Sequence, residues 1–328
     1  MDLNESRCTG SIVGLAVGDA IGYPAEFRRR AQILAEIGGD GIQDFIALKD
    51  PRFSRPFFTC PDHPPGTFTD DTQMSIAVAE SLLSANSGNL DQIMEEMSVR
   101  FVAWADASSN NRAPGGACMQ GCGNLSRGIP WREAGVADSK GCGSAMRVAP
   151  IGLFYDDLDR VTEVARASSL LTHGHPAALD AAAAAALMVA MALQNATPQQ
   201  MYDEIEKRCC HSSADFFATW RKLPAMLALP PEHVLTKNVL GEGWIGEEAV
   251  ASAMYCFWRS PDDYSSAVLT AINTDGDSDS IGAITGSVMG ARLGINAIPL
   301  SWRDRVEDSE YLHALGKRLW QNRGIRRP

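Results

Sequence analysis

The sequence predicts an all-α protein, and two observations carry this prediction. Helical patterns recur along most of the chain, whereas alternating β-branched runs, which are typical of strands, are scarce. The chain has 328 residues, of which 45% are hydrophobic and 21% are charged. That length can bury a full core as one large domain or as two, and the composition is typical of a globular protein.

Two glycine-striped segments mark the two ends of the predicted helical series. Residues 10–22 and residues 282–294 each place glycine at every fourth position. An interior glycine costs a helix about 1 kcal/mol relative to alanine, so a stripe of glycine indicates that another backbone approaches that face closely. We expect two packed core helices. Neither segment has the twenty uninterrupted apolar residues of a membrane dimerisation motif.

Further helices are predicted between these two segments. The first covers residues 69–83, with apolar residues at 74, 77, 78 and 82 on one face and acids at its start, where they suit the positive end of the helix dipole. The others cover residues 90–106, 160–171, 176–193, 198–209, 247–258 and 265–272. Three Pro- and Gly-rich segments, residues 49–66, 108–123 and 128–143, are predicted to be long loops, which commonly build the site of a helical domain.

Charge and cysteine usage narrow the class of protein. The 29 Lys and Arg residues against 40 Asp and Glu residues give a formal net charge of -11, which argues against nucleic-acid and anionic-membrane partners. The first seven residues lack the order of a signal peptide, so the eight cysteines are expected to be reduced thiols. The alanine-rich run 177–193 contains Asp180 and is expected to be a buried helix rather than a membrane span. These features predict a cytoplasmic protein.

Carboxylates gather at two places in the sequence. Asp70 and Asp71 follow Thr69 at the start of a predicted helix, and taken alone they favour a capping role. The segment 273–280 adds carboxylates at positions 275, 277 and 279 and runs directly into the second glycine-striped helix. So much unpaired negative charge beside a core helix requires a cation.

The pattern of these acids also restricts the cation. An EF-hand loop starting at Asp275 would need glycine at its sixth position and glutamate at its twelfth, where the sequence has Ser280 and Gly286. Oxygen clusters without nearby histidine or cysteine ligands suit Mg²⁺ or Mn²⁺, and five carboxylates are more than one such ion usually takes from a protein. A dinuclear site that holds and polarises a water is therefore expected.

Two further motifs have more than one interpretation. The glycine-rich turn from Gly141 to Arg147 could cradle a phosphate with its backbone amides or be only a turn. His173 and His175 lie at a helix boundary, where a structural role and a hydrogen bond to a substrate are comparable, and metal ligation is less favoured. The four other histidines, at positions 63, 211, 233 and 313, are expected to be structural or surface residues.

The order of these motifs resembles that of the ADP-ribosylglycohydrolase family, which includes ADP-ribosylarginine hydrolases and the dinitrogenase-reductase-activating glycohydrolase. The resemblance rests on the segments 18–26 (GDAIGYPAE), 66–72 (GTFTDDT), 141–147 (GCGSAMR), 172–173 (TH) and 277–280 (DSDS). Together they span about residues 10 to 295, and five motifs in the family's order are specific although no single one is decisive.

The resemblance implies a fold and a set of site residues. The fold would be an orthogonal helical bundle around a central cleft with two Mg²⁺ or Mn²⁺ ions. The implied metal ligands are Thr69, Asp70, Asp71, Asp277, Asp279 and Ser280. Glu26, Asp70 and Asp71 would act in catalysis, with either aspartate as the general base, and Glu26 would contribute to the metal centre or its water. The ADP-ribose pocket would be lined by Ser139, Gly141, Gly143, Ser144 and His173. Asp19 would support the fold of the first loop.

The implied activity is removal of ADP-ribose from a modified protein, with modified arginine as the leading acceptor. Arginine-directed relatives often carry an Asp-Ile-Gly piece where this chain has residues 111–118, and Asp106 would replace that acid only if the loop folds back. Modified serine, a nucleotide or a small ester therefore stays open as the acceptor.

Two alternatives to this activity remain. The first is an immunity-type protein that neutralises an ADP-ribosyltransferase by occlusion. The second is a dinuclear phosphohydrolase, whose product would be AMP rather than ADP-ribose.

One large domain, residues 1–328, explains the length better than two domains. The implied ligands run from Glu26 to Ser280 and have to converge on one site. Two divalent cations would also bring the formal charge from -11 to -11 + 4 = -7, so part of the acidity would belong to a metal site.

Overall fold

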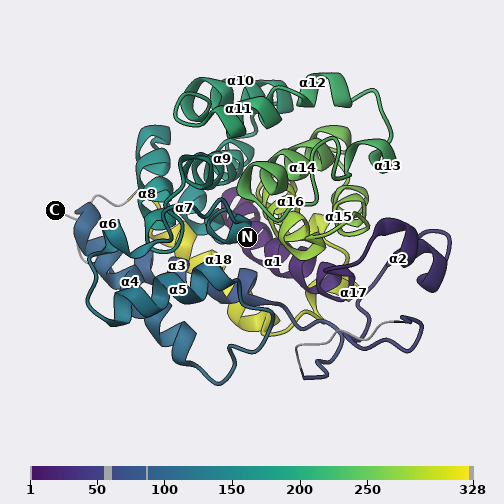
Figure 1. Ribbon diagram of the computed structural model, residues 1–328, viewed down its shortest axis with the longest axis horizontal. Coiled ribbons are helices and arrows are strands. Elements are labelled where there is room, and N and C mark those ends of the chain that lie inside the picture. Colours follow the sequence, from purple (N-terminus) through teal and green to yellow (C-terminus); the bar gives the residue numbers. More distant parts are fainter. Residues whose placement is uncertain (1, 55–60, 86–87, 325–328) are drawn as a thin grey trace.

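The computed structural model describes residues 2–54, 61–85 and 88–324, and these residues form a single all-helical body (Figure 1). Within these ranges, pairing of extended chain is limited to three isolated bridges, which confirms the all-α prediction. The helices are α1 (Leu3–Gly22), η1 (Tyr23–Ala25), α2 (Arg30–Ile37), α3 (Asp70–Ser84), α4 (Leu90–Asp106), α5 (Gly116–Ser126), α6 (Trp131–Ala134), η2 (Cys142–Ser144), α7 (Ala149–Phe154), α8 (Leu158–Leu170), α9 (Pro176–Leu193), α10 (Pro198–Cys209), α11 (Ala214–Trp220), α12 (Leu223–Met226), α13 (Pro231–Val234), α14 (Gly246–Arg259), α15 (Tyr264–Ile272), α16 (Ser278–Leu293), η3 (Ile295–Ala297), α17 (Leu300–Arg303) and α18 (Ser309–Gln321).

The two glycine-striped helices, α1 and α16, pack against each other in antiparallel orientation. A Cβ atom added at Gly10 would lie 2.7 Å from the Gly290 carbonyl oxygen, and one added at Gly18 would lie 2.5 Å from the Gly282 carbonyl carbon. These separations are too short for any side chain, so the backbones are in direct contact. The predicted close approach is confirmed, and it brings the end of α1 to the start of α16.

Helix α9 lies in the core. It is long and apolar enough to cross a membrane by composition, but 89% of it is buried inside the protein. It packs against α7, α8, α14 and α16. Its many alanines allow these neighbours to approach closely, and Asp180 forms an ion pair with Arg166 of α8. The prediction of a buried helix is confirmed, and the seven described cysteines are all free thiols.

Two of the predicted loops are partly helical. Segment 108–123 contains the start of α5, and segment 128–143 contains the short helix α6. Glycines at 116, 121 and 123 lower the helix propensity of α5. The glycine at 121 is required by packing, because a Cβ atom there would lie 2.5 Å from the Leu171 carbonyl oxygen. Tertiary contact therefore outweighs the local preference. The predicted loop 49–66 includes positions 55–60, which lie outside the described residues.

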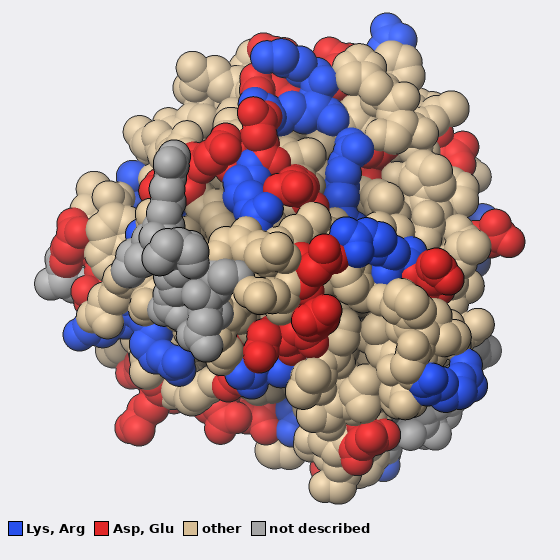
Figure 2. All heavy atoms as spheres, turned by 90° about the vertical axis from the view of Figure 1, so that its left-hand side faces the viewer, with Lys and Arg blue, Asp and Glu red and all other residues tan. Residues whose placement is uncertain are grey.

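Several helices were not predicted from the sequence. They are α2, α7, α11, α12, α13, α17 and α18. Most of them are short, but α18 is amphipathic and packs along α1. On the face drawn in Figure 2, basic and acidic side chains are interspersed and do not gather into one basic patch.

Candidate functional site

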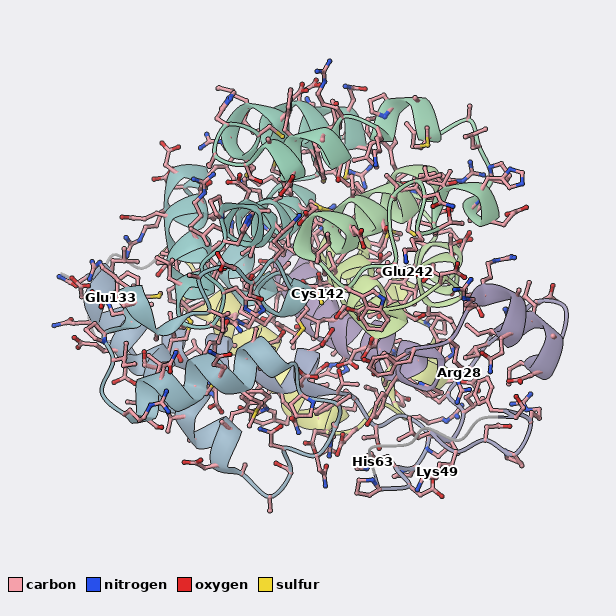
Figure 3. The ribbon with its side chains drawn as sticks, in the orientation of Figure 1. Arg28, Lys49, His63, Glu133, Cys142 and Glu242 are labelled. Carbon is pink, nitrogen blue, oxygen red and sulfur yellow. The ribbon has the colours of Figure 1, made fainter. Side chains whose placement is uncertain are left out.

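A cavity of about 420 Å³ opens between the start of α3, the start of α16 and the loops around α5 and η2. Figure 3 shows Cys142, one of its lining residues, near the middle of the molecule. Its walls contain most of the residues that the sequence indicated: Glu26, Asp70, Asp71, Ser139, Gly141, Gly143, His173, Asp277, Asp279 and Ser280. The remaining two, Thr69 and Ser144, are buried behind the wall rather than lining it.

Three carboxylates in this cavity lie close enough together to hold a metal ion. Glu26, Asp277 and Asp279 each offer an oxygen, and these atoms all lie within 4.8 Å of one another. Glu26 follows the turn η1 at the end of α1, and the two aspartates stand at the start of α16. The antiparallel contact of α1 and α16 therefore explains how Glu26 converges with two residues that lie more than 200 positions later in the sequence.

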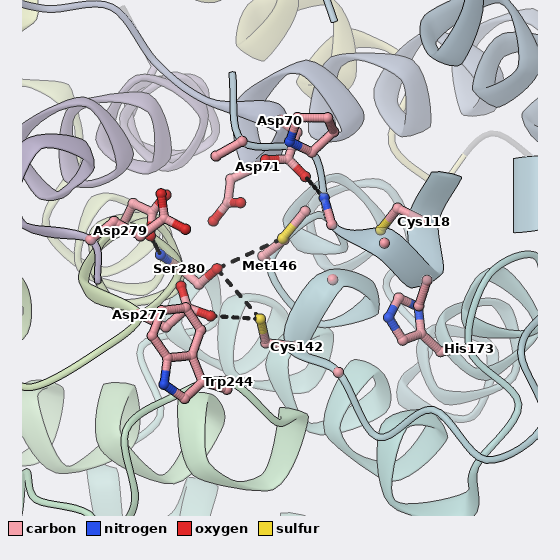
Figure 4. A pocket seen from close by; sticks show the side chains of 18 of the residues that line it. Asp70, Asp71, Cys118, Cys142, Met146, His173, Trp244, Asp277, Asp279 and Ser280 are labelled. Atoms are coloured by element: carbon pink, nitrogen blue, oxygen red, sulfur yellow. Dashed lines mark hydrogen bonds between the residues drawn. The ribbon is translucent and has the colours of Figure 1, made fainter. Parts of the chain in front are cut away.

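The second pair of acids is placed by a buried carboxylate. Asp19 of α1 accepts hydrogen bonds from the Thr69 amide at 2.9 Å and from the Thr72 amide at 3.1 Å, and its side chain is fully buried. Thr69 caps α3 by accepting from the Asp71 amide at 3.2 Å. The start of α3 is thus fixed to α1 by Asp19, for which the resemblance implied only support of the first loop, and Asp70 and Asp71 face the cavity (Figure 4).

Only two of the three acids in segment 275–279 point into the cavity. Asp275 turns away and accepts a hydrogen bond from the Arg30 amide at 2.8 Å. The expectation that all three carboxylates join one cation cluster is therefore wrong. The third carboxylate of the cluster is that of Glu26. The turn at Gly276, with φ of +88°, directs Asp275 and Asp277 to different places.

The electrostatics of these acids fit divalent cations. Burial and the neighbouring carboxylates raise the pKa of Asp70 to about 8, and burial first and mutual repulsion second raise the pKa of Asp71 and Asp279 well above the usual range. The Oδ2 atom of Asp71 is buried and has no hydrogen-bond partner in the described part of the chain. Hard oxygen ligands that repel one another, in a described cavity lining without Lys or Arg, are the ligand set that Mg²⁺ or Mn²⁺ prefers.

The sequence reasoning missed Cys142 at this site. Its thiol donates a hydrogen bond to Asp277 Oδ2 at 2.9 Å, and its sulfur lies 3.6 Å from Ser280 Oγ. Burial and the adjacent Asp277 raise the pKa of the thiol, so it remains protonated and orients the carboxylate. The position of Cys142 inside the glycine-rich turn was the available signal.

The other end of the cavity is neutral and rich in glycine. A Cβ atom at Gly141 would lie 2.9 Å from His173 Nε2, and one at Gly143 would lie 2.7 Å from Cys118 Sγ. Glycine at these two positions therefore avoids a clash with the neighbouring side chains. Burial lowers the pKa of His173 to about 3, which keeps the ring neutral, and its Nδ1 lies 2.8 Å from Thr172 Oγ1. Such a surface can offer amides to an anion without a counter-charge.

Two of the indicated residues serve the frame of the site. Thr69 caps α3 and has no exposed surface. The Ser144 hydroxyl donates to the Ala178 carbonyl at 3.4 Å. Their roles toward a metal or a substrate stay predictions.

The loop 111–118 closes one side of the cavity. Arg112 holds it in place through a 2.5 Å ion pair with Glu307 and a 2.9 Å hydrogen bond to the Phe68 carbonyl. The Gly115 amide donates to Asp70 Oδ2 at 3.3 Å. Asp106 is exposed and is not among the described residues that line the cavity. The loop therefore does not bring Asp106 to the site.

The fold and this cavity together define a class of protein: an all-α protein in which acids from the two ends of the chain converge on one pocket. The comparison with known families agrees. The model of the ADP-ribosylglycohydrolase family matches residues 2–328, and the chain belongs to this family.

Similar proteins extend over nearly the whole chain. It is 25% identical to the ADP-ribosylarginine hydrolase Tri1 of Serratia proteamaculans, over 96% of this chain and 79% of that protein. It is 27% identical to the ADP-ribosylhydrolase ARH3 of Xenopus tropicalis, over 98% and 97%. A solved structure titled an ADP-ribosylglycohydrolase-related protein complex superposes with a TM-score of 0.75 and 26% identity, covering 98% of this chain and 99% of that one. The protein is an enzyme that removes ADP-ribose from modified acceptors.

Proposed function

We propose that this protein is a Mg²⁺- or Mn²⁺-dependent hydrolase that releases ADP-ribose from modified arginine on a cytoplasmic protein, and so reverses the product of an ADP-ribosyltransferase. The observation that carries the metal dependence is the convergence of Glu26, Asp277 and Asp279, with oxygens within 4.8 Å of one another, on a cavity that Asp70 and Asp71 also line. Two divalent cations would compensate these five carboxylates.

The ligand set for the two ions follows from the residues that surround the cavity. Asp70, Asp71, Asp277, Asp279 and Ser280 would hold the ions together with Thr69, whose carbonyl or hydroxyl stands at the start of α3. Such ions would supply a polarised water and a Lewis acid for the ribose hydroxyls.

The protein's own groups account for the remaining steps. Cleavage at the anomeric carbon of the ribose develops oxocarbenium character, which the surrounding carboxylates stabilise. Asp70 or Asp71 removes a proton from the attacking water. Glu26 orients that water from its place beside Asp277 and Asp279. The backbone amides around Gly141 and Gly143 donate hydrogen bonds to the diphosphate, since the described lining of the cavity offers no Lys or Arg for that purpose.

The name of the relative Tri1 and the negative charge of the cavity favour arginine as the acceptor. A modified guanidinium keeps its positive charge, and five carboxylates with two divalent cations leave a formal charge of -5 + 4 = -1. A neutral acceptor such as serine gains nothing from this charge.

The test uses a protein ADP-ribosylated on arginine, with release of ADP-ribose identified by mass. Wild type with Mg²⁺ or Mn²⁺ is expected to release ADP-ribose, and EDTA or Asp279→Asn is expected to reduce the rate by at least 100-fold. Asp275→Asn is the matched control, because Asp275 lies outside the cavity and the amide keeps the oxygen that accepts from Arg30. Full activity in EDTA would contradict the metal dependence, and AMP as the product would contradict the reaction.

A further inference from the structure

One arginine lies completely buried behind the neutral end of the cavity. The side chain of Arg147, between η2 and α7, has no exposed surface, and it does not line the cavity. One terminal nitrogen donates to the Ser168 carbonyl and to Thr172 Oγ1, both at 2.8 Å. The other lies 3.7 Å from Met74 Sδ and 3.8 Å from Cys118 Sγ. None of these partners is a carboxylate. A buried cation is costly unless its hydrogen bonds compensate it, so these partners indicate what the arginine does.

The Thr172 hydroxyl connects this arginine to His173. Thr172 Oγ1 lies 2.8 Å from the Arg147 nitrogen and 2.8 Å from His173 Nδ1, and the threonine side chain is fully buried. A guanidinium can only donate hydrogen bonds, whereas a hydroxyl donates one and accepts others. Thr172 Oγ1 therefore accepts from Arg147, and its single proton is left for Nδ1 of His173.

The number of available protons decides which nitrogen of His173 is protonated. If Nδ1 carried the proton, Thr172 Oγ1 would accept from both neighbours, and its own proton would have no acceptor among the described residues. A buried donor without an acceptor disfavours that arrangement by about tenfold or more. Nδ1 is therefore the acceptor, and Nε2 carries the proton. Burial first and the Arg147 charge second lower the pKa of His173 to about 3, so the ring stays neutral.

The protonated Nε2 of His173 faces the glycine-rich turn of the cavity. His173 lines the cavity, and Cβ atoms added at Gly141 and Gly143 would lie 2.9 and 3.4 Å from Nε2. Within the described residues this nitrogen has no hydrogen-bond partner. In Figure 4 the ring lies apart from Asp277 and Asp279. Its N–H group is therefore open to a ligand at the place where the backbone amides are proposed to hold the diphosphate.

We infer that Arg147 is a positioning residue: its donor-only guanidinium holds the Thr172 hydroxyl toward His173 and so fixes the imidazole as a neutral Nε2–H donor. The inference rests on the proposed function, because this donor would face the diphosphate of ADP-ribose. An acceptor nitrogen at the same place would repel the phosphate oxygens. The protein thus excludes the wrong tautomer before the substrate binds.

The first measurement is the tautomer of His173 in the wild-type protein. NMR of protein with ¹⁵N-labelled histidine reports all six rings, and His173→Asn identifies the signals of this one. We expect a protonated Nε2 and an acceptor Nδ1. Free ADP-ribose with Mg²⁺, at a concentration that calorimetry shows to be saturating, is expected to shift the Nε2–H proton downfield. A ring protonated at Nδ1 overturns the inference, and so does an Nε2–H proton that bound ADP-ribose leaves unchanged.

Two substitutions separate the hydrogen-bonding role of Arg147 from a packing role. Arg147→Gln offers an amide oxygen that can accept from Thr172, so the hydroxyl and Nδ1 can exchange roles. We expect both tautomers, and an affinity for free ADP-ribose about twofold lower, because about half the molecules then carry the wrong tautomer. Arg147→Lys keeps a charged group that can only donate, and it is expected to restore the Nε2–H tautomer. The same tautomer ratio in both variants overturns the inference, since loss of packing alone lowers stability without changing that ratio.

The hydroxyl provides an independent pair of variants if the substitutions of the buried arginine do not fold. Thr172→Val removes the proton that Nδ1 accepts, so the Nδ1 resonance is expected to move to the position of an acceptor nitrogen without a hydrogen bond. Thr172→Ser is expected to keep the resonance in place. Thr162→Val is the matched control, because the Thr162 hydroxyl donates to the Leu158 carbonyl on α8 and lies outside the cavity. An Nδ1 resonance in Thr172→Val equal to that of wild type overturns the inference.

The results separate this inference from the proposed function. The tautomer measurement needs neither a modified protein nor turnover. A wild type that carries the Nε2–H tautomer and binds ADP-ribose, but releases none from the arginine-linked protein, overturns the proposed function and upholds the inference. A wild type that releases ADP-ribose but is protonated at Nδ1 does the reverse.

Discussion

The contact between α1 and α16 makes a quantitative prediction for Gly18→Ala. A Cβ atom at this position would lie 2.5 Å from the Gly282 carbonyl carbon and closer still to its oxygen, and both belong to a buried helix that cannot rotate away. Overpacking of this kind costs about 3 kcal/mol at the upper end of its usual range, and better helix propensity returns about 1 kcal/mol. We therefore expect a net loss of about 2 kcal/mol in the free energy of unfolding.

The assay is urea unfolding followed by circular dichroism, together with thermal melting. A loss of about 2 kcal/mol lowers the thermal midpoint by roughly 3 °C in a protein of this size. The comparison requires two-state unfolding. Unfolding curves followed by fluorescence and by circular dichroism test this, because they coincide when unfolding is two-state.

The matched control is Gly123→Ala, the same chemical change in another helix. A Cβ atom at Gly123 of α5 meets no atom within 4 Å. Helix propensity then acts alone, and the variant is expected to be more stable than wild type by about 1 kcal/mol. Equal effects of the two substitutions, or a stabilised Gly18→Ala, would refute the reasoning that backbone contact rather than glycine itself matters at position 18.

Three further predictions concern the site. Asp19→Asn presents an N–H group where the Thr69 or Thr72 amide needs an acceptor. We expect it to lower the free energy of unfolding by about 2 kcal/mol and to lower kcat, measured by urea unfolding and by turnover. The control Asp106→Asn, at an exposed position, is expected to change neither quantity. Gly22→Ala is expected to weaken Mn²⁺ binding about tenfold in calorimetry, because its Cβ atom would lie 2.6 Å from Asp279 Cα; unchanged binding would contradict the placement of this ligand. Burial raises the pKa of Asp70 from 3.8 to about 8 in the folded, metal-free protein. Between these two values the folded state holds a proton that the unfolded chain has released. The stability that this bound proton contributes is lost as the pH rises toward 8. The rise in thermal midpoint on adding Mn²⁺ to EDTA-treated protein is therefore expected to grow between pH 6 and 8, and a constant rise would argue against ligation by these acids.

Much of the architecture is determined by the local pattern of the sequence. The helix boundaries at 90–106, 176–193 and 198–209 agree with α4, α9 and α10 because each has a cap or a proline at its start and a clear change of composition at its end. The glycine spacing of four in α1 and α16 likewise predicts their close contact, since residues four apart lie on the same face of a helix.

Local pattern fails where tertiary contact overrides it. Helix α5 contains three glycines, so its sequence predicts a loop. Its small residues nevertheless allow it to pack closely against the chain at Leu171. The acids of segment 275–279 look equivalent in sequence, yet the turn at Gly276 sends Asp275 to the Arg30 amide and Asp277 to the cavity. Periodicity cannot distinguish them, because the direction of a side chain in a turn depends on the dihedral angles that the packed neighbours impose.

The sequence by itself determined the fold class, the family and the set of acids from which the site is built. Only the tertiary structure decided that Glu26 joins Asp277 and Asp279, that Cys142 donates to Asp277, and that Phe27 stacks on Trp244 at the mouth of the cavity. The physical reason is that helix formation depends on neighbours within about four residues, whereas these contacts join segments more than a hundred residues apart whose relative position is set by the packing of α1 on α16.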